Sequence, residues 1–217
     1  MKRATTNLFV VLIMCIGLVI TLYSVIQISA TEDINEEYKH PDVDMTVIYD
    51  KTADLRIVKD NSISELAEEN IRYQIATYLP EKIIKKITVP IQICNYDIDA
   101  DIDTLMDGYK CYGYVRSVKG KPIFMKIRDD NISYKNNVVL HEVGHIIDEG
   151  KVYSHSEEFR SIYEAESEKS GLSEYCISSV SEYFAQAFQE YYLNNEEFKE
   201  NAPETFAYIE LVELCTR

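Results

Sequence analysis

The spacing of hydrophobic residues predicts an amphipathic helix from Val138 to Asp148. At about 100° per residue, such a helix separates its apolar and polar side chains onto opposite faces. The apolar face holds Val139, Leu140, Val143, Ile146 and Ile147, and the opposite stripe holds Val138, His141, Glu142, His145 and Glu149. We therefore expect one face to pack in a core and the other to carry chemistry.

Other patterns predict the elements around this helix. Apolar residues at helical spacing predict helices over Ile63–Leu79 and over Ser178–Leu193. A capping box of Ser62 and Glu65 is expected to start the first of them. Short β-branched runs predict strands at Thr46–Tyr49, Leu55–Val58, residues 88–94, Tyr112–Val118 and Ile123–Arg128. Together they indicate one α+β domain over residues 45–217, with a small mixed sheet and a mostly helical C-terminal half.

The last two strands flank a Lys-Gly-Lys-Pro turn and are expected to form a hairpin. The second of them, Ile123–Arg128, is followed after a short link by the Val138–Asp148 helix. From this position we predict that it is the edge strand that walls a cleft and pairs with an extended peptide.

The N-terminus predicts export. Met1-Lys2-Arg3 is basic, and the run from Leu8 to Ala30 is almost free of polar side chains. Residues 1–30 fit a cleaved signal peptide, but about 23 apolar residues also suffice for a membrane anchor. An acidic linker over residues 31–44 would follow. Both alternatives place the domain outside the cytoplasm, secreted or anchored by residues 8–30, and only this segment would contact a membrane.

The charge and the cysteines narrow the function without identifying it. A net charge of −15 argues against nucleic-acid binding and permits a basic peptide as substrate, although an acidic coat that keeps the protein soluble fits equally well. Outside the N-terminal segment four cysteines remain, Cys94, Cys111, Cys176 and Cys215, which fit either disulfides or buried thiols. Aspartates at 97, 99, 101 and 103 lack the glycine and glutamate of a calcium loop, and a solvated acidic loop is expected.

The polar stripe of the central helix reads H-E-x-x-H. His141 and His145 lie one turn apart and can each give a ring nitrogen to one Zn²⁺, while Glu142 can act as a general base. The alternative is a chance grouping on a solvated face. Gly144 is expected to leave room above the metal.

A catalytic zinc needs a third protein ligand. The metzincin spacing fails, because Asp148 and Lys151 stand where a glycine and a third ligand would be needed. The Ser178–Leu193 helix instead carries a polar stripe of Glu182, Gln186, Gln189 and Glu190, and Glu182 is the candidate ligand. Its alternative role is a capping box with Ser179.

The runs Ser181-Glu182-Tyr183-Phe184-Ala185-Gln186-Ala187-Phe188 and Asn201-Ala202-Pro203-Glu204-Thr205-Phe206 resemble the C-terminal catalytic domain of anthrax lethal factor. The run Tyr191-Tyr192-Leu193-Asn194 resembles the secreted clostridial Pro-Pro endopeptidases of the same zinc metallopeptidase family. This resemblance implies a zincin-like fold, zinc ligands His141, His145 and Glu182, and assistance to catalysis from Tyr175. Two positions depart from the family pattern: Gln186 stands where a glutamate commonly supports the metal site, and Val180-Ser181 replaces an acidic residue.

The sequence thus predicts an exported zinc endopeptidase that hydrolyses a protein or peptide, basic or proline-containing, with zinc as cofactor and no nucleic-acid partner. The alternative is a catalytically weak, toxin-like interaction module of the same fold.

Overall fold

A computed structural model describes residues 41, 43–99, 110–132, 135 and 137–216. It divides the chain into two units, Met1–Lys39 and His40–Arg217, and all of the described residues belong to the second. The predicted signal or anchor segment and residues 31–40 of the predicted linker lie outside them. No helix in the described part is long and apolar enough to cross a membrane.

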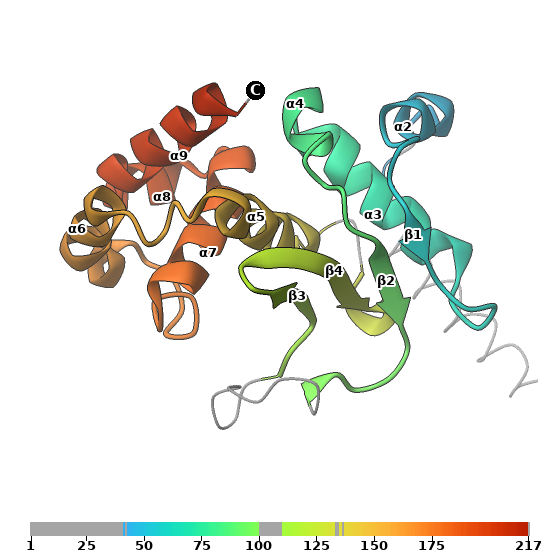
Figure 1. Ribbon diagram of the computed structural model, residues 1–217. Helices are drawn as coiled ribbons and strands as arrows, with labels where there is room; N and C mark the ends of the chain where they lie inside the picture. Colours follow the sequence, from blue (N-terminus) through green and yellow to red (C-terminus); the bar gives the residue numbers. More distant parts are fainter. Residues whose placement is uncertain (1–40, 42, 100–109, 133–134, 136, 217) are drawn as a thin grey trace, which may run out of the picture. The chain divides into compact units, whose positions relative to one another are not determined.

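The described unit alternates helices and strands in its first half and is helical in its second half (Figure 1). The helices are α2 (Met45–Lys51), α3 (Glu65–Tyr78), α4 (Glu81–Ile84), α5 (Val138–Lys151), α6 (Glu157–Glu166), α7 (Val180–Tyr192), α8 (Glu196–Asn201) and α9 (Pro203–Cys215). The strands are β1 (Ile57–Val58), β2 (Ile91–Cys94), β3 (Gly113–Val118) and β4 (Lys121–Arg128). Short 3₁₀ turns follow β4, at Asp129–Asn131, and α6, at Ser167–Lys169. The predicted α+β class is correct.

The strands form a mixed sheet in the order β1-β2-β4-β3. β1 and β4 both run parallel to β2, and β3 pairs antiparallel with β4. The hairpin turn places Lys119 and Gly120 at φ 53° and 68°, the positive values that a two-residue hairpin turn of type I′ requires. The predicted hairpin is confirmed, but β4 is interior. The prediction that the second strand forms the edge is therefore wrong, and β3 occupies that place.

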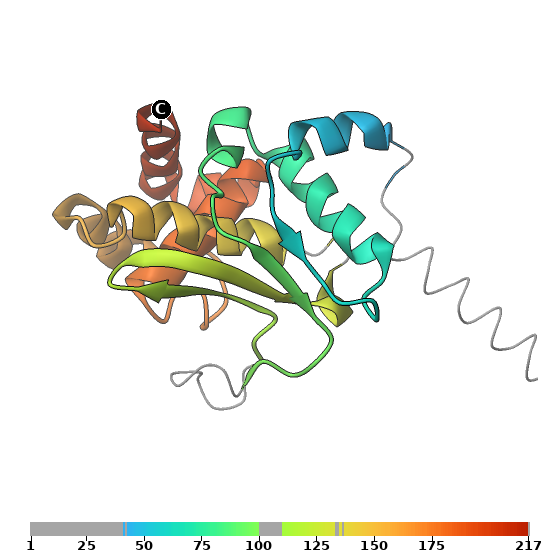
Figure 2. The same ribbon diagram turned by 45° about the vertical axis from the view of Figure 1, so that its right-hand side comes forward.

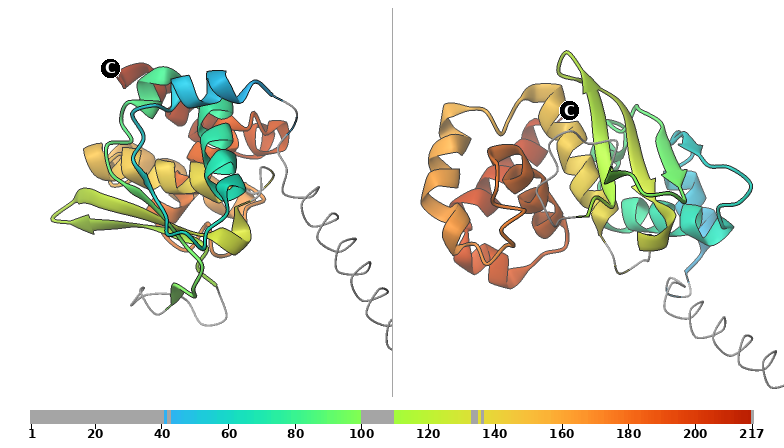
Figure 3. Two further views of the ribbon diagram at one scale, coloured as in Figure 1. Left: turned by 90° about the vertical axis from the view of Figure 1, so that its right-hand side faces the viewer. Right: turned by 90° about the horizontal axis from the view of Figure 1, so that it is seen from below.

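Helix α5 lies between the sheet and the C-terminal helices (Figure 3, right). With α3 it covers one face of the sheet (Figure 2), so that its apolar side chains meet those of the inner strands. Val139, Leu140 and Val143 are fully buried in the same core as Met125 and Ile127 of β4. The predicted apolar face of this helix is confirmed.

Close packing of α7 against α5 depends on Gly144. A Cβ atom added there would lie 2.8 Å from the Cα of Ala185 and 3.2 Å from the Cβ of Phe188. Because neither atom belongs to a flexible side-chain end, the two helix backbones approach this closely only if residue 144 has no side chain. Gly144 thus makes room for a helix rather than for a metal, which corrects the expectation from the sequence.

Two further predictions fail at the N-terminal side. Thr46–Tyr49 is part of α2, not a strand, because the Asp44 carboxylate accepts a hydrogen bond from the Thr46 N–H and caps a helix whose Ile48 packs on α3. Ser62 does not cap α3; the Ser64 hydroxyl does, by accepting from the Ala67 N–H. In both cases a hydrogen bond to a capping side chain one or two residues away from the predicted position determines where the helix begins.

The four described cysteines are free thiols, so the disulfide alternative finds no support. Cys94 and Cys111 are buried, and Cys215 is exposed. Asp101 and Asp103 of the predicted acidic loop lie outside the described residues.

Candidate metal centre and active site

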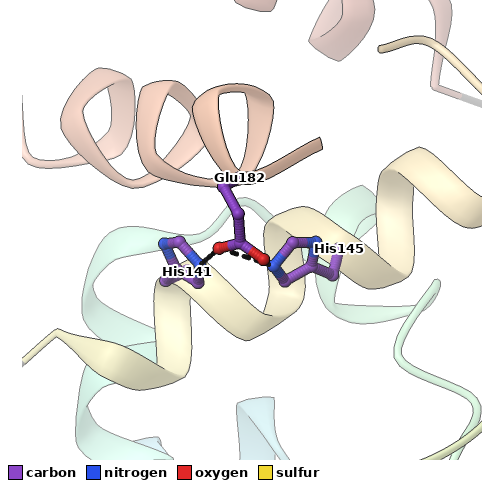
Figure 4. A group of neighbouring side chains, drawn as sticks. All are labelled: His141, His145 and Glu182. Carbon is purple, nitrogen blue, oxygen red and sulfur yellow. Dashed lines mark hydrogen bonds and ion pairs between the residues drawn. The ribbon is translucent and has the colours of Figure 1, made fainter. Parts of the chain in front are cut away.

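Helix α5 presents His141 and His145 on one stripe, with ring centroids 4.9 Å apart. Glu182 comes from the first turn of α7 and points its carboxylate between the two rings (Figure 4). Its Oε2 lies 3.1 Å from Nε2 of His141 and 3.5 Å from Nε2 of His145. The structure thus brings together two histidines and a glutamate that are about 40 residues apart in the sequence, as the polar stripes on the two helices predict.

The Ser179 hydroxyl explains how Glu182 is held in this position. It accepts a hydrogen bond of 3.2 Å from the Glu182 N–H and begins α7 there. The Glu182 side chain is not used for capping and leaves the helix toward α5. Ser179 is therefore a cap, and this role does not compete with a ligand role for Glu182.

The carboxylate and the two imidazoles are strongly coupled. Burial opposes charge on Glu182, but the hydrogen bonds from His141 and His145 hold the pKa of this carboxyl well below its usual range. Burial likewise opposes a charged His145, yet its hydrogen bond and charge interaction with Glu182 raise the pKa of this histidine to about 9. A site that stabilises positive charge beside a carboxylate in this way suits a bound cation.

The three residues fit a zinc ion. Their ligand atoms, two ring nitrogens and a carboxylate oxygen, all lie within 4.8 Å of one another. Among the His, Cys, Asp and Glu side chains of the described residues, these three are placed so that they could share one metal ion. Nδ1 of His141 lies 3.0 Å from Oε1 of Gln186, an acceptor, so Nδ1 carries a proton, and a metal bound between the ligands would take the place of the proton that Nε2 shares with Glu182. Two imidazoles and one carboxylate are a known donor set of catalytic zinc.

Glu142 lies next to this group and is buried. Its Oε2 has no hydrogen-bond partner among the described residues. Burial raises the pKa of its carboxyl, and the neighbouring histidines oppose that rise. An unpartnered buried carboxylate oxygen beside a metal-suited cluster is what a general base requires before its substrate water arrives.

Gly113 at the start of β3 was not singled out from the sequence. A Cβ atom at this position would lie 2.9 Å from Oε1 of Glu142, so the absence of a side chain lets the edge strand pass directly beside the carboxylate. The only signal in the sequence is a glycine between two tyrosines at the start of a predicted strand.

Tyr175 also lies at the site. Burial raises the pKa of its phenol, and so do the charges of Glu182 and Glu142 and a hydrogen bond with Glu182. Its hydroxyl therefore stays protonated and can donate a hydrogen bond in the metal site, as the family resemblance implies.

Two thiols that the sequence did not connect with the site lie close to it. The Cys111 thiol donates a hydrogen bond of 2.9 Å to the Gly113 carbonyl, and burial followed by the charge of Glu142 raises its pKa to about 12. Cys176 Sγ lies 3.5 Å from Oε1 of Gln186. Burial raises the pKa of the Cys176 thiol. Both are thus kept as neutral thiols rather than as thiolate metal ligands.

Asp148, which occupies a key position in the excluded metzincin pattern, has a different role. Its buried carboxylate accepts hydrogen bonds from the N–H and hydroxyl of Ser154, at 2.7 and 2.6 Å. It therefore fixes the chain where it leaves α5.

Comparison with known proteins bears on the family and the fold. The family model described as anthrax toxin lethal factor, N- and C-terminal domain, matches residues 58–212, well over half of the chain. The solved structure of the Pro-Pro endopeptidase PPEP-2 from Paenibacillus alvei superimposes with a TM-score of 0.57, at 17% identity, over 76% of this chain and 99% of that one. No curated protein matches the sequence. The family match runs from the end of β1 to Val212 within α9 and includes every residue of the cluster, and the chain therefore belongs to the anthrax lethal factor family of zinc metallopeptidases.

Proposed function

We propose that this protein is an exported zinc endopeptidase that hydrolyses peptide bonds in a protein substrate. One observation carries the proposal: the metal-suited group of His141, His145 and Glu182 lies directly beside the buried, unpartnered carboxylate oxygen of Glu142. Membership of a peptidase family supports the same reaction class. Export rests on the pattern of residues 1–30 alone.

His141, His145 and Glu182 would hold the zinc ion. When bound there, zinc supplies Lewis-acid activation of water and of the peptide carbonyl. Glu142 takes a proton from the attacking water as the oxygen–carbon bond forms, and delivers it to the leaving nitrogen as the carbon–nitrogen bond breaks. Tyr175 donates a hydrogen bond to the carbonyl oxygen as negative charge develops on it. The products are a carboxylate and an amine.

The free edge of the sheet gives the substrate a place to bind. β3 is one of the two edge strands of the described sheet, and at Gly113 it starts beside Glu142. An extended peptide that pairs with β3 would bring a main-chain carbonyl close to the cluster. β3 thus takes the role that the sequence predicts for β4.

A proline-containing substrate is the more specific form of the proposal. It rests on the name of the similar structure, a Pro-Pro endopeptidase, and on the likeness of Tyr191–Asn194 to such enzymes. A basic substrate would suit the net charge of −15.

Replacing Glu142 tests the proposal. Glu142→Gln keeps the size of the side chain beside Gly113 but cannot accept a proton, so peptide hydrolysis should fall by about 10²- to 10⁴-fold while the bound zinc stays at one ion per chain. Glu174→Gln, in an exposed loop, is the matched control and should retain full activity. Loss of zinc from Glu142→Gln would make Glu142 a ligand and overturn its assignment as the base. A wild-type protein that binds zinc and cleaves no peptide would favour the alternative interaction module.

A further inference from the structure

We infer that Glu190 is a positioning residue, which acts through Gln186 to keep the ring proton of His141 on Nδ1 and so leaves Nε2 free to bind the metal. This inference deepens the proposed function and rests on the metal site described above. From the sequence alone Glu190 lies on the polar stripe of α7 and its replacement is not expected to lower zinc affinity; the hydrogen bonds of α7 lead to the opposite expectation.

A continuous line of hydrogen bonds connects the three residues. Nε2 of Gln186 donates to Oε1 of Glu190 at 2.6 Å, and Oε1 of Gln186 lies 3.0 Å from Nδ1 of His141. Glu190 is buried, with 8% of its surface exposed. Gln186 and Glu190 are four residues apart on α7, and this spacing places their side chains one above the other.

The direction of the line follows from what each group can do. An ionised carboxylate only accepts hydrogen bonds, so Glu190 must face the amide nitrogen of Gln186. The amide oxygen must then face His141. Because that oxygen only accepts, the nitrogen opposite it, Nδ1, must carry the proton. When a metal takes the place of the proton between Nε2 and Glu182, the ring is neutral and Nε2 is its lone-pair donor to the metal.

Glu190 is itself held in one orientation by donors. Nδ2 of Asn195 donates to its Oε2 at 2.7 Å, and Nε2 of Gln189 lies 3.4 Å from its Oε1. The thiol of Cys176 approaches Oε1 of Gln186 at 3.5 Å and favours the same amide orientation. The side chains of Gln186, Gln189 and Asn195 all face Glu190 with a donor nitrogen, which fits an acceptor-only carboxylate.

This arrangement accounts for the departure from the family pattern at residue 186. The family commonly has a glutamate there, which would accept directly from the histidine. Here a neutral amide occupies that place and the negative charge stands one helical turn further along, at Glu190. Because the Gln186 amide donates its N–H to Glu190, its carbonyl oxygen faces His141 as an acceptor.

Zinc affinity tests the inference without reference to peptide cleavage. The metal-free protein is titrated with Zn²⁺ in competition with a chromophoric chelator, for the wild type, Glu190→Gln, and the exchanged pair Gln186→Glu/Glu190→Gln. Glu190→Gln frees the Gln186 amide to turn and should weaken zinc binding by about 10- to 100-fold, the usual effect of losing a group that orients a ligand. The exchanged pair keeps the net charge and again sets an acceptor-only group against Nδ1, so it should recover most of the affinity. Glu196→Gln, an exposed carboxylate at the start of α8, is the control and should bind zinc as the wild type does.

Several results would overturn the inference. Unchanged zinc affinity in Glu190→Gln would do so, with or without a fall in melting temperature, since a purely structural role alters stability alone. An exchanged pair that binds zinc as weakly as the single variant would show that acceptor orientation is not what matters. If Glu190→Gln fails to fold, Gln186→Met breaks the line at its centre and must show the same loss of affinity. Intact zinc binding in all of these with normal peptidase activity would leave the proposed function standing and remove only the role of Glu190.

Discussion

Glu182 shows how much one residue of this site depends on its surroundings. Its backbone N–H is bound by the Ser179 cap, and its carboxylate is shared between two imidazoles from another helix. Removing its negative charge leaves two histidines that hold a divalent ion only weakly.

We therefore predict that Glu182→Gln lowers zinc affinity by more than the 10- to 100-fold typical of an outer partner of a metal site, whereas Glu174→Gln has no effect. The amide keeps the size of the side chain, so the fold should persist. Equilibrium dialysis against Zn²⁺ for both variants checks this. Wild-type affinity in Glu182→Gln would mean that another residue is the third ligand.

Tyr175 allows transition-state stabilisation to be separated from packing. A phenol that donates to a developing oxyanion helps the transition state more than the bound substrate, so Tyr175→Phe should reduce kcat and kcat/KM together, by about 10²-fold. Bound zinc and melting temperature should hardly change, because the ring is retained. Tyr49→Phe, on the exposed helix α2, is the control for loss of a hydroxyl.

Steady-state kinetics, metal analysis and a melting curve on both tyrosine variants provide the measurement. A fully active Tyr175→Phe variant would show that Tyr175 contributes only packing. An unfolded variant would show that its hydroxyl is needed for the fold.

At the residue scale the sequence predicted which side chains meet, because helical periodicity alone puts His141, Glu142 and His145 on one stripe and Glu182 at the head of another. It did not reveal Gly113 or Cys111. Their approach to Glu142 depends on the path of an edge strand, for which the sequence has no periodic signal.

At the scale of helices, the contact between α5 and α7 decides whether the ligands can meet. Gly144→Ala would place a Cβ atom 2.8 Å from the Ala185 backbone and push the helices apart. We predict a loss of about 1 to 3 kcal/mol of unfolding free energy, together with weaker zinc binding, since Glu182 moves with α7.

Gly150→Ala, on the same helix with open space around it, is the matched control and should be neutral or stabilising by up to about 1 kcal/mol. Chemical denaturation with and without zinc measures both. A Gly144→Ala protein as stable as the wild type would show that the helix contact tolerates a side chain.

The long, strongly periodic elements were predicted well, and the short ones were not. Val138–Asp148 and Ser178–Leu193 correspond closely to α5 and α7, because each buries a full apolar face. Thr46–Tyr49 has strand propensity but forms α2, since an Asp44 cap and a small cluster with α3 outweigh a weak local preference. The place of β4 inside the sheet could not be predicted either, because strand order is set by long-range pairing with β2.

At the scale of the whole molecule, the described unit carries the candidate metal ligands, and the net charge of the chain is −15. Cleavage needs all parts at once: the metal, the base and an accessible sheet edge. An interaction module would need the fold and the sheet edge but not a working zinc site. Dependence of cleavage on zinc therefore distinguishes the two functions.

The decisive measurement is the hydrolysis of a peptide library, followed by mass spectrometry, by the purified protein as zinc-loaded, chelator-stripped and zinc-restored samples. We predict internal peptide-bond cleavage by the loaded protein, its loss on stripping and its return with one Zn²⁺ per chain. Equal cleavage by the stripped protein, or none by a protein that holds one zinc ion, would contradict the assignment of this chain as a zinc endopeptidase.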